Sequence, residues 1–427
     1  MALSVQKGTV TAPTGVGATN VVSLDASKFS VANPCRALVI WGTFGATNTA
    51  TDGDARMSKG YVTRNGGAIA QTYVTGFDAD TLGTSASSQG INSGFCMKGY
   101  ATATTMDYTA AVTAFSDTGF TLTWADPPAV AFEVHFMAIG GADCTGAHCG
   151  VYTPTLTATQ DIALPAGFGQ PNVVMFNFAD RPDAVADFKN DLTLVFGWDN
   201  VTSKSAIYYG AYTAAALMNL YGQTRSDGSW VTSARQASLA ARNVWSTDSF
   251  RMTYSATNDR ASPTTFLALT GPFTSTIGQG VAPIAGTPPV VQDIAHTAAT
   301  TPKGAFVMGT PLIHAANDTT SVDLGGIWFG GTDGVNEGTA GIVNDDNNTT
   351  SFAGVWTNAT KVIQNRISPG VAGAPTLMAE ADGLISGTNL RLSWNDTDTT
   401  ARAYYYLILG DAVPVPTLTL PTFQGAY

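Results

Sequence analysis

The stretch that decides the fold is Phe115–Gly141, which contains two strand-like halves joined by a turn. The first half, Phe115–Trp124, reads FSDTGFTLTW, and its end alternates apolar residues with threonine, the period of a half-buried strand. Pro127-Pro128 cannot continue a hydrogen-bonded ladder and marks the turn. The second half, Phe132–Gly141, reads FEVHFMAIGG and is apolar on both faces near its end, which is typical of a strand inside a packed sandwich.

The same hairpin occurs twice more in the chain. The copies are FRMTY at Phe250–Tyr254 with FLALTG at Phe266–Gly271, and LRLSW at Leu390–Trp394 with YYYLILG at Tyr404–Gly410. Trp124 to Gly140, Tyr254 to Thr270 and Trp394 to Gly410 are equal spacings. Any β-rich protein contains aromatic strands, but an unbroken register in three copies favours an internal repeat.

Two further elements recur before each hairpin. An apolar run of strand length follows a proline at Pro34–Gly42, Pro171–Phe178 and Pro302–Gly309. A second apolar run occupies Met57–Val62, Leu192–Trp198 and Gly326–Gly330, and a polar loop follows each copy. The sequence therefore predicts an all-β protein of three tandem β-sandwich, jelly-roll-like modules with Gly/Pro-rich connectors.

The predicted division of the chain follows the repeats. We expect module 1 at residues 1–143, module 2 at 150–271 and module 3 at 287–412, with connectors at 141–150 and 271–286. Residues 413–427 are proline-rich and predict an extended arm, which could lie on a neighbouring subunit or on the surface of its own chain. The alanine run at Ala214–Met218 favours a short helical turn.

Composition narrows the class of protein. The 427 residues suit three domains of roughly 100–150 residues each. Only 12% of the residues are charged and the net charge is −11, which argues against a general nucleic-acid binder. Neither a secretory signal nor a membrane-spanning stretch is recognisable, so we expect synthesis in a cytoplasm and no membrane insertion.

No catalytic constellation stands out. His135 lies in an apolar strand, where a hydrogen-bonded sheet residue is expected rather than a general base, and His296 and His314 have no Cys or paired carboxylates nearby. Neither a nucleophile elbow nor a phosphate-binding glycine loop is present. We therefore expect no enzyme and no cofactor, and we nominate no catalytic or binding residue.

Metal sites are weakly indicated at best. Cys144, His148 and Cys149 could supply three zinc ligands or a local disulfide, but the usual ligand spacing is missing. Asp52–Asp54 and Asn344–Asn348 could hold calcium, although hydrogen-bonded turns explain both segments better.

Two groups of apolar side chains are expected in the core. The first comprises two cysteines, Cys35 and Cys96, read as small buried hydrophobes. The second comprises three tryptophans that could alternatively stack on sugar rings, Trp230, Trp245 and Trp356.

The repeated strands resemble a module common in structural proteins of tailed bacteriophages. Gly119–Thr123 and Phe136–Gly141 match its Gly-Phe-Thr-Leu-Thr and Leu-Ala-Leu-Gly-Gly type strands, and Tyr406–Gly410 matches in part. The middle copy departs, with Ser249 and Thr270 at two glycine positions. The resemblance covers most of the chain, implies a virion component made in the host bacterial cytoplasm, and identifies no active site.

The expected function is therefore a non-enzymatic virion structural protein of the tail, baseplate or fibre apparatus. Its expected partners are other virion proteins and copies of itself, with a host surface glycan as a further candidate. The alternatives are a capsid decoration protein, a carbohydrate-binding adhesin, and a glycan hydrolase, for which no carboxylate pair can be nominated. Three similar modules could also surround a pseudo-threefold axis and imitate a trimer.

Overall fold

The structure is a computed structural model. It describes residues 2–44, 54–65, 67–78, 87–101, 105–154, 159–179, 191–200, 202–213, 218–225, 230–231, 239–254, 263–284, 286–296, 300–311, 319–322, 324–345, 352–368 and 375–414.

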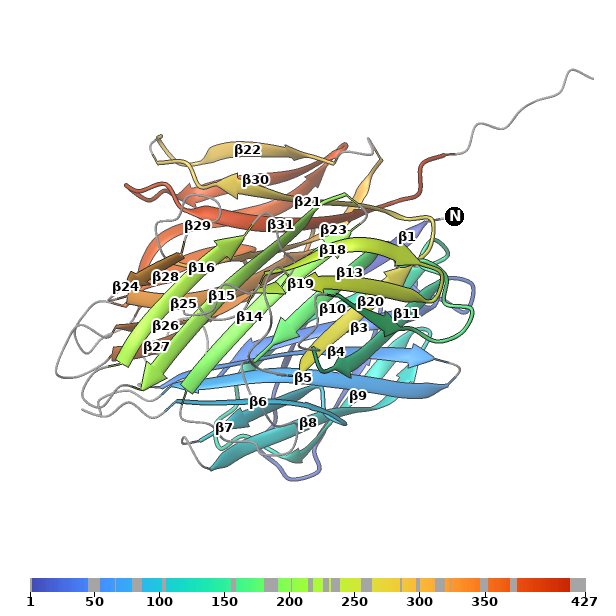
Figure 1. Cartoon of the computed structure of the whole chain (residues 1–427), viewed down its shortest axis with the longest axis horizontal. Helices are drawn as coiled ribbons and strands as arrows, with labels where there is room; N and C mark the ends of the chain where they lie inside the picture. Colours follow the sequence, from blue (N-terminus) through green and yellow to red (C-terminus); the bar gives the residue numbers. More distant parts are fainter. Residues whose placement is uncertain are drawn as a thin grey trace, which may run out of the picture.

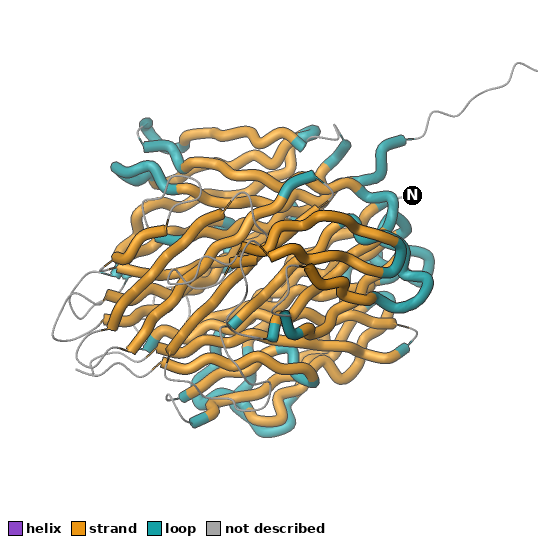
Figure 2. Tube along the Cα trace, viewed as in Figure 1, coloured by secondary structure: helices purple, strands orange, loops and turns teal. Residues whose placement is uncertain are grey.

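The described chain is built from antiparallel β-sheets, and the prediction of an all-β fold is confirmed (Figures 1 and 2). These segments contain no helix, and hence none that is long and apolar enough to cross a membrane. The strands form six sheets, which fall into three pairs of one large and one four-stranded sheet. We call the three pairs repeats 1, 2 and 3.

Repeat 1 contains β1–β10. Its large sheet has the order β1-β10-β3-β4-β5-β6, with strands Leu3–Thr11, Glu133–Gly141, Cys35–Thr43, Ala55–Asn65, Ala68–Asp78 and Ser87–Ser93. Its small sheet has the order β2-β9-β8-β7, with strands Thr19–Ser23, Gly119–Asp126, Met106–Ser116 and Met97–Tyr100.

Repeat 2 contains β11–β20 in the same arrangement. Its large sheet has the order β11-β20-β13-β14-β15-β16, with strands Gly146–Tyr152, Thr264–Thr270, Val173–Phe178, Asp191–Asn200, Lys204–Thr213 and Met218–Arg225. Its small sheet has the order β12-β19-β18-β17, with strands Thr159–Ala163, Ser249–Tyr254, Leu239–Ser246 and Trp230–Val231.

Repeat 3 contains β21–β31. Its large sheet has the order β21-β31-β23-β25-β26-β27, with strands Thr274–Val281, Ala403–Gly410, Pro302–Gly309, Leu324–Thr332, Glu337–Asp345 and Phe352–Asn358. Its small sheet has the order β22-β30-β29-β28, with strands Val290–Ala295, Asn389–Asp396, Thr376–Ser386 and Ile363–Ile367. The additional strand β24, Thr319–Val322, pairs with β16 and so extends the large sheet of repeat 2.

Four hydrophobic cores hold these layers together. Each repeat has a core between its own two sheets, centred on Trp124 in repeat 1, Phe250 in repeat 2 and Trp394 in repeat 3. The fourth core takes residues from the large sheets of all three repeats, among them Trp41 and Phe329. The large sheets therefore pack against one another, while the small sheets lie on the outside (Figure 1).

Two predicted connectors contain strands instead. Half of the 141–150 connector belongs to β11, so the first strand of repeat 2 begins before the predicted module start at residue 150. The 271–286 connector contains β21. Each is the edge strand of the next large sheet, in the place that β1 has in repeat 1.

Glycine in these edge strands has a packing role, which explains why a glycine-rich sequence predicted connectors where the structure has strands. A Cβ at Gly150 would lie 3.0 Å from the Phe266 ring, and one at Gly278 would lie 2.3 Å from the Tyr406 hydroxyl. The glycines leave room for an aromatic side chain on the neighbouring strand. A glycine-rich sequence between two repeats therefore marks a strand here.

Two other predictions lie largely outside the described residues. Residues 214–217 of the expected helical turn are not described, and Met218 begins the strand β16. In the expected C-terminal arm only Val413 and Pro414 are described, and both lie outside any strand.

Candidate functional site at the junctions between repeats

Strand pairing defines which residues are equivalent in the three repeats. Gly60, Gly197 and Gly330 pair with equivalent residues of the preceding strand, Ile40, Phe176 and Val307. Three residues further on stand Thr63, Asn200 and Asp333. On the edge strands the residues opposite Met137, Leu267 and Leu407 are Lys7, Cys149 and Ile277.

The edge strand of the next repeat is bonded in each case by the residue three positions after the glycine, which is Thr63, Asn200 or Asp333. The bonds are Cys149 N to Thr63 Oγ1 at 3.2 Å, Asn200 Nδ2 to Ser275 O at 3.3 Å, and Lys7 N to Asp333 Oδ2 at 3.1 Å. Repeat 1 thus binds repeat 2, repeat 2 binds repeat 3, and repeat 3 binds repeat 1. The bonded atoms differ, because Thr63 and Asp333 accept a backbone N–H whereas Asn200 donates to the Ser275 carbonyl. The three contacts run head to tail from equivalent positions and close into a ring, as in a cyclic trimer.

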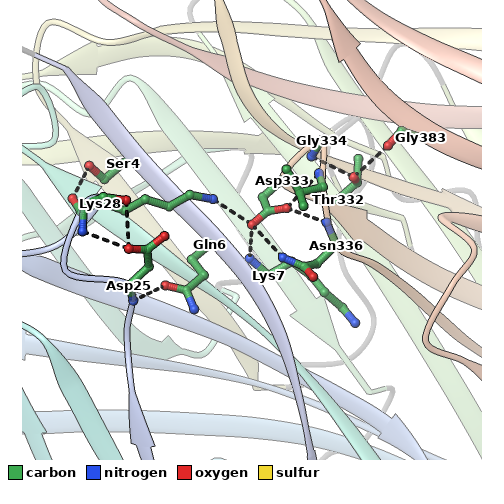
Figure 3. Close-up of polar contacts among 12 residues, drawn as sticks. Ser4, Gln6, Lys7, Asp25, Lys28, Thr332, Asp333, Gly334, Asn336 and Gly383 are labelled. Atoms are coloured by element: carbon green, nitrogen blue, oxygen red, sulfur yellow. Dashed lines mark hydrogen bonds and ion pairs between the residues drawn. The ribbon is translucent and has the colours of Figure 1, made fainter.

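The junction that closes the ring differs from the other two in its charge. Figure 3 shows the Asp333 carboxylate receiving the backbone N–H of Lys7 and the ammonium of Lys28, whose Nζ lies 2.8 Å from Oδ2. Its other oxygen accepts the N–H groups of Val335 and Asn336 in the β25–β26 turn. The side chain of Asp333 is fully buried, so repeat 3 presents a buried, fully bonded carboxylate to repeat 1.

A second carboxylate of repeat 3 binds the same edge strand. Asp411, directly after β31, accepts the N–H of Leu3 at 3.0 Å and lies 3.0 Å from the ammonium of Lys303. Exposed strand edges with unpaired N–H groups promote aggregation. Two aspartates of repeat 3 therefore protect the outer edge of β1 and align it with the ring.

Burial and hydrogen bonds shift the pKa values of the ionisable groups at the junction between repeats 3 and 1. Burial alone would raise the pKa of Asp333, but the hydrogen bond from Lys28 and those from backbone N–H groups outweigh it and lower the pKa. Burial lowers the pKa of Lys7 to about 8, against the attraction of Glu133 and Asp333. Burial raises the pKa of Glu337 to about 7, and its carboxyl group accepts the N–H of Gly383.

A buried lysine lies where the three large sheets meet. Lys59, Phe196 and Phe329 immediately precede the equivalent glycines, and the Lys59 ammonium lies 4.4 Å from the Phe196 ring centre and 3.8 Å from that of Phe329. Lys59 is wholly buried, its Nζ has no hydrogen-bond partner in the described structure, and burial holds its pKa well below the usual value. The amino group of Lys59 therefore faces aromatic rings of the other two repeats at the centre of the pseudo-trimer.

Side chains of different size are matched across the junctions. Tyr61, one residue after Gly60, donates its hydroxyl to Asn177 of repeat 2 at 2.9 Å. Its equivalent in repeat 3 is Gly331, where a Cβ would lie 3.1 Å from the Trp41 ring of repeat 1. Trp41 is in turn the equivalent of Asn177. The large tryptophan of repeat 1 therefore packs against the repeat that has glycine.

One of the histidines singled out in the sequence, His135, takes part in a contact between repeats. His135 is wholly buried, and its ring nitrogens lie 2.8 Å from Thr357 Oγ1 of repeat 3 and 3.3 Å from Thr9 Oγ1. Burial, and then the charge of Lys7, hold its pKa well below the ordinary value, which suits a neutral sheet residue. His296 is held by Thr274 and Thr276, whereas His314 lies outside the described residues.

The structure does not assemble a metal site from the cysteines. Within the described segments no three His, Cys, Asp or Glu side chains come together as metal ligands. Cys144 and Cys149 are buried free thiols, and burial raises their pKa values to about 12 and about 11. The Cys149 thiol faces repeat 1, 3.2 Å from the carbonyl of Ala70. Cys35 and Cys96 are buried as well.

The other candidate residues are structural where the structure describes them. Trp245 and Trp356 belong to the cores of repeats 2 and 3, while the side chain of Trp230 lies outside the described part. Asp54 is paired with Arg56, and Asn344 and Asp345 belong to β26. The remaining residues of both candidate calcium segments are not described.

A small, mostly apolar cavity lies in repeat 3. Its volume is about 10 Å³, and its lining includes the unbonded Trp328 Nε1, Asn365 Oδ1 and Thr310 Oγ1. Such a space holds one water molecule at most, so it offers no room for a substrate.

Comparisons with protein-family models and with curated proteins found no match. The resemblance to phage structural modules therefore remains a prediction from the repeated strands.

Proposed function

We propose that the chain is a non-enzymatic structural protein of a phage particle, working in the tail, baseplate or fibre apparatus. The observation that supports this is the closed ring of three repeats, in which a residue at one equivalent position bonds repeat 1 to 2, 2 to 3, and 3 to 1. A single chain thereby has the form of a trimer, which suits a component that sits on or beside a symmetry axis of an assembly.

The chemistry of the most conspicuous polar groups agrees with this role. The buried groups Asp333, His135 and Lys7 make their bonds to other protein atoms at the junction between repeats 1 and 3. Groups that position subunits need such saturated, buried bonds. A catalytic acid or base would instead need access to a substrate.

The test is the copy number per particle, measured by quantitative mass spectrometry of purified virions and scaled to the major capsid protein. The tail assignment predicts a few to dozens of copies. A count in the hundreds would contradict it and support the alternative of a capsid decoration protein. Absence from the particle would overturn both assignments and favour the adhesin and enzyme alternatives.

A further inference from the structure

The outer faces of the three small sheets differ at one equivalent position. In repeat 2, Arg251 on β19 binds Asp161 on β12 through two bonds of 2.7 Å. In repeat 3, Arg391 on β30 binds Asp293 on β22 in the same way, at 2.7 and 2.9 Å. Both ion pairs lie on the exposed side of the sheet.

Repeat 1 lacks this ion pair. The strand register places Val21 opposite Thr121 where the other repeats have aspartate opposite arginine. Val21 is 76% exposed, although valine is an apolar residue. The sequence has thus left one of three otherwise similar faces uncharged.

A groove follows this uncharged face. It has a volume of about 200 Å³ and runs between β2, β8 and β9, where it is lined by Val21, Val22, Ser23, Ala114, Ser116, Thr118, Gly119, Phe120 and Thr121. None of these residues is charged. The groove therefore suits an extended segment that is itself uncharged, with small apolar side chains and hydroxyl groups.

The chain contains such a segment beyond the last described residue. The thirteen residues Val415–Tyr427 carry no charged side chain, and Thr417–Leu420 alternate threonine with leucine. Prolines stand on both sides of this stretch.

The position of the attachment point favours a groove on another molecule. In Figure 1, β8 and β9 lie at the bottom, whereas the described chain ends at the upper right. Thirteen residues span at most about 45 Å, while a compact chain of 427 residues has a diameter of about 55 Å. A neighbouring copy can present its groove within that reach.

We propose that residues 415–427 bind the uncharged groove of repeat 1 on a second copy of this chain. The segment and the groove are different surfaces, so the contact generates a dimer by reciprocal exchange, a larger ring or a filament of pseudo-trimers. Binding of residues 415–427 to the groove of repeat 1 does not depend on the place of the protein in a virion.

The test is sedimentation velocity over a range of concentrations, on the full chain and on two variants. One variant ends at Pro414. The other is Val21→Asp with Thr121→Arg, which installs the ion pair that repeats 2 and 3 already carry, so the fold should tolerate it. We expect the full chain to self-associate and both variants to require at least tenfold higher concentration.

The matched control is Asp161→Val with Arg251→Thr, which removes the equivalent ion pair from repeat 2 and should preserve self-association. Thermal unfolding of each variant shows that it is folded. A full chain that stays monomeric at 100 µM and above, or a variant of either kind that associates as the full chain does, would overturn the proposal.

Discussion

Asp333 is the residue on which the closing junction depends. It accepts hydrogen bonds from Lys7, Lys28 and two N–H groups of its own turn while fully buried. Asp333→Ala leaves these donors unpaired, and we expect it to lower the free energy of unfolding by about 3 kcal/mol. Chemical denaturation measures this loss.

The control for this change is Asp161→Ala, which removes an ion pair that is open to solvent. Exposed pairs contribute little, so no resolvable change in stability is expected. Equal effects of the two substitutions would show that Asp333 has no special role in closing the ring.

Glu337 gives the junction a dependence on pH. Its pKa is raised by burial to about 7, whereas an unfolded chain has a value of about 4.3. A raised carboxyl pKa means that the folded state prefers the protonated form, so stability is lost as pH rises from about 4.3 to 7. We expect Glu337→Gln to remove this loss and to gain about 2 kcal/mol over the wild type at pH 8.

The measurement is the free energy of unfolding of both proteins between pH 4 and 8. Asp333 acts with the opposite sign, because its lowered pKa stabilises the fold above about pH 4 and that stabilisation is lost on acidification. Parallel curves for wild type and Glu337→Gln would contradict the expected role of Glu337.

Lys59 is expected to cost stability. Its ammonium is buried without a hydrogen-bond partner in the described structure, and the two aromatic rings compensate for only part of the lost hydration. We expect Lys59→Met, which keeps the shape of the side chain, to raise the free energy of unfolding by about 2 kcal/mol. A thermal melt that is unchanged or lower would mean that the cation stabilises the centre of the ring.

At the scale of the strands, the pairing of glycine with an aromatic ring is the repeated feature. A Cβ at Gly8 would lie 2.2 Å from the Phe136 ring, and its equivalents are Gly150 and Gly278. Gly8→Ala is therefore expected to destabilise the protein by about 2 kcal/mol, because ring and strand must move apart. Gly15→Ala is the control, since its nearest neighbour lies 3.8 Å away.

A second substitution tests the cause directly. Phe136→Leu should recover part of the stability of the Gly8→Ala variant, because leucine is smaller than the ring in the contact. If the two losses simply add, the contact between residue 8 and the ring is not what makes glycine necessary.

Local patterns predicted the four strands that recur in each repeat but misread two edge strands. The hairpins at Phe115–Gly141 and its two copies were recognisable because apolar alternation is set by neighbours in sequence. The edge strands β11 and β21 were read as connectors, because their glycines are required by rings more than a hundred residues away. Glycine alone does not distinguish a linker from a strand that faces an aromatic residue.

The junctions could not be located from the sequence for a similar reason. Lys7 and Asp333 are 326 residues apart, and no local pattern connects them. One signal was available: Lys59 stands in an apolar strand where the equivalent strands have phenylalanine. A charged residue at such a position indicates a special environment, which the structure places where the three repeats meet.

At the scale of the molecule, the matched side chains fix the order of the repeats. Trp41 fits against Gly331 of repeat 3, and Asn177 fits against Tyr61 of repeat 1. Three copies of repeat 1 would place Tyr61 against Trp41 and overpack the junction. The three repeats have therefore diverged into partners that fit in one cyclic order, which a trimer of identical subunits cannot achieve.

The central claim is that the three repeats close into a ring, and small-angle X-ray scattering of the intact protein, extrapolated to infinite dilution so that the monomer is measured, tests it without any substitution. A closed, compact chain of 427 residues has a radius of gyration of about 22 Å. An open string of three modules, each of about 14 Å and spaced about 30 Å apart, gives about 28 Å. A value near 22 Å is the predicted result, and a value near 28 Å would contradict the ring.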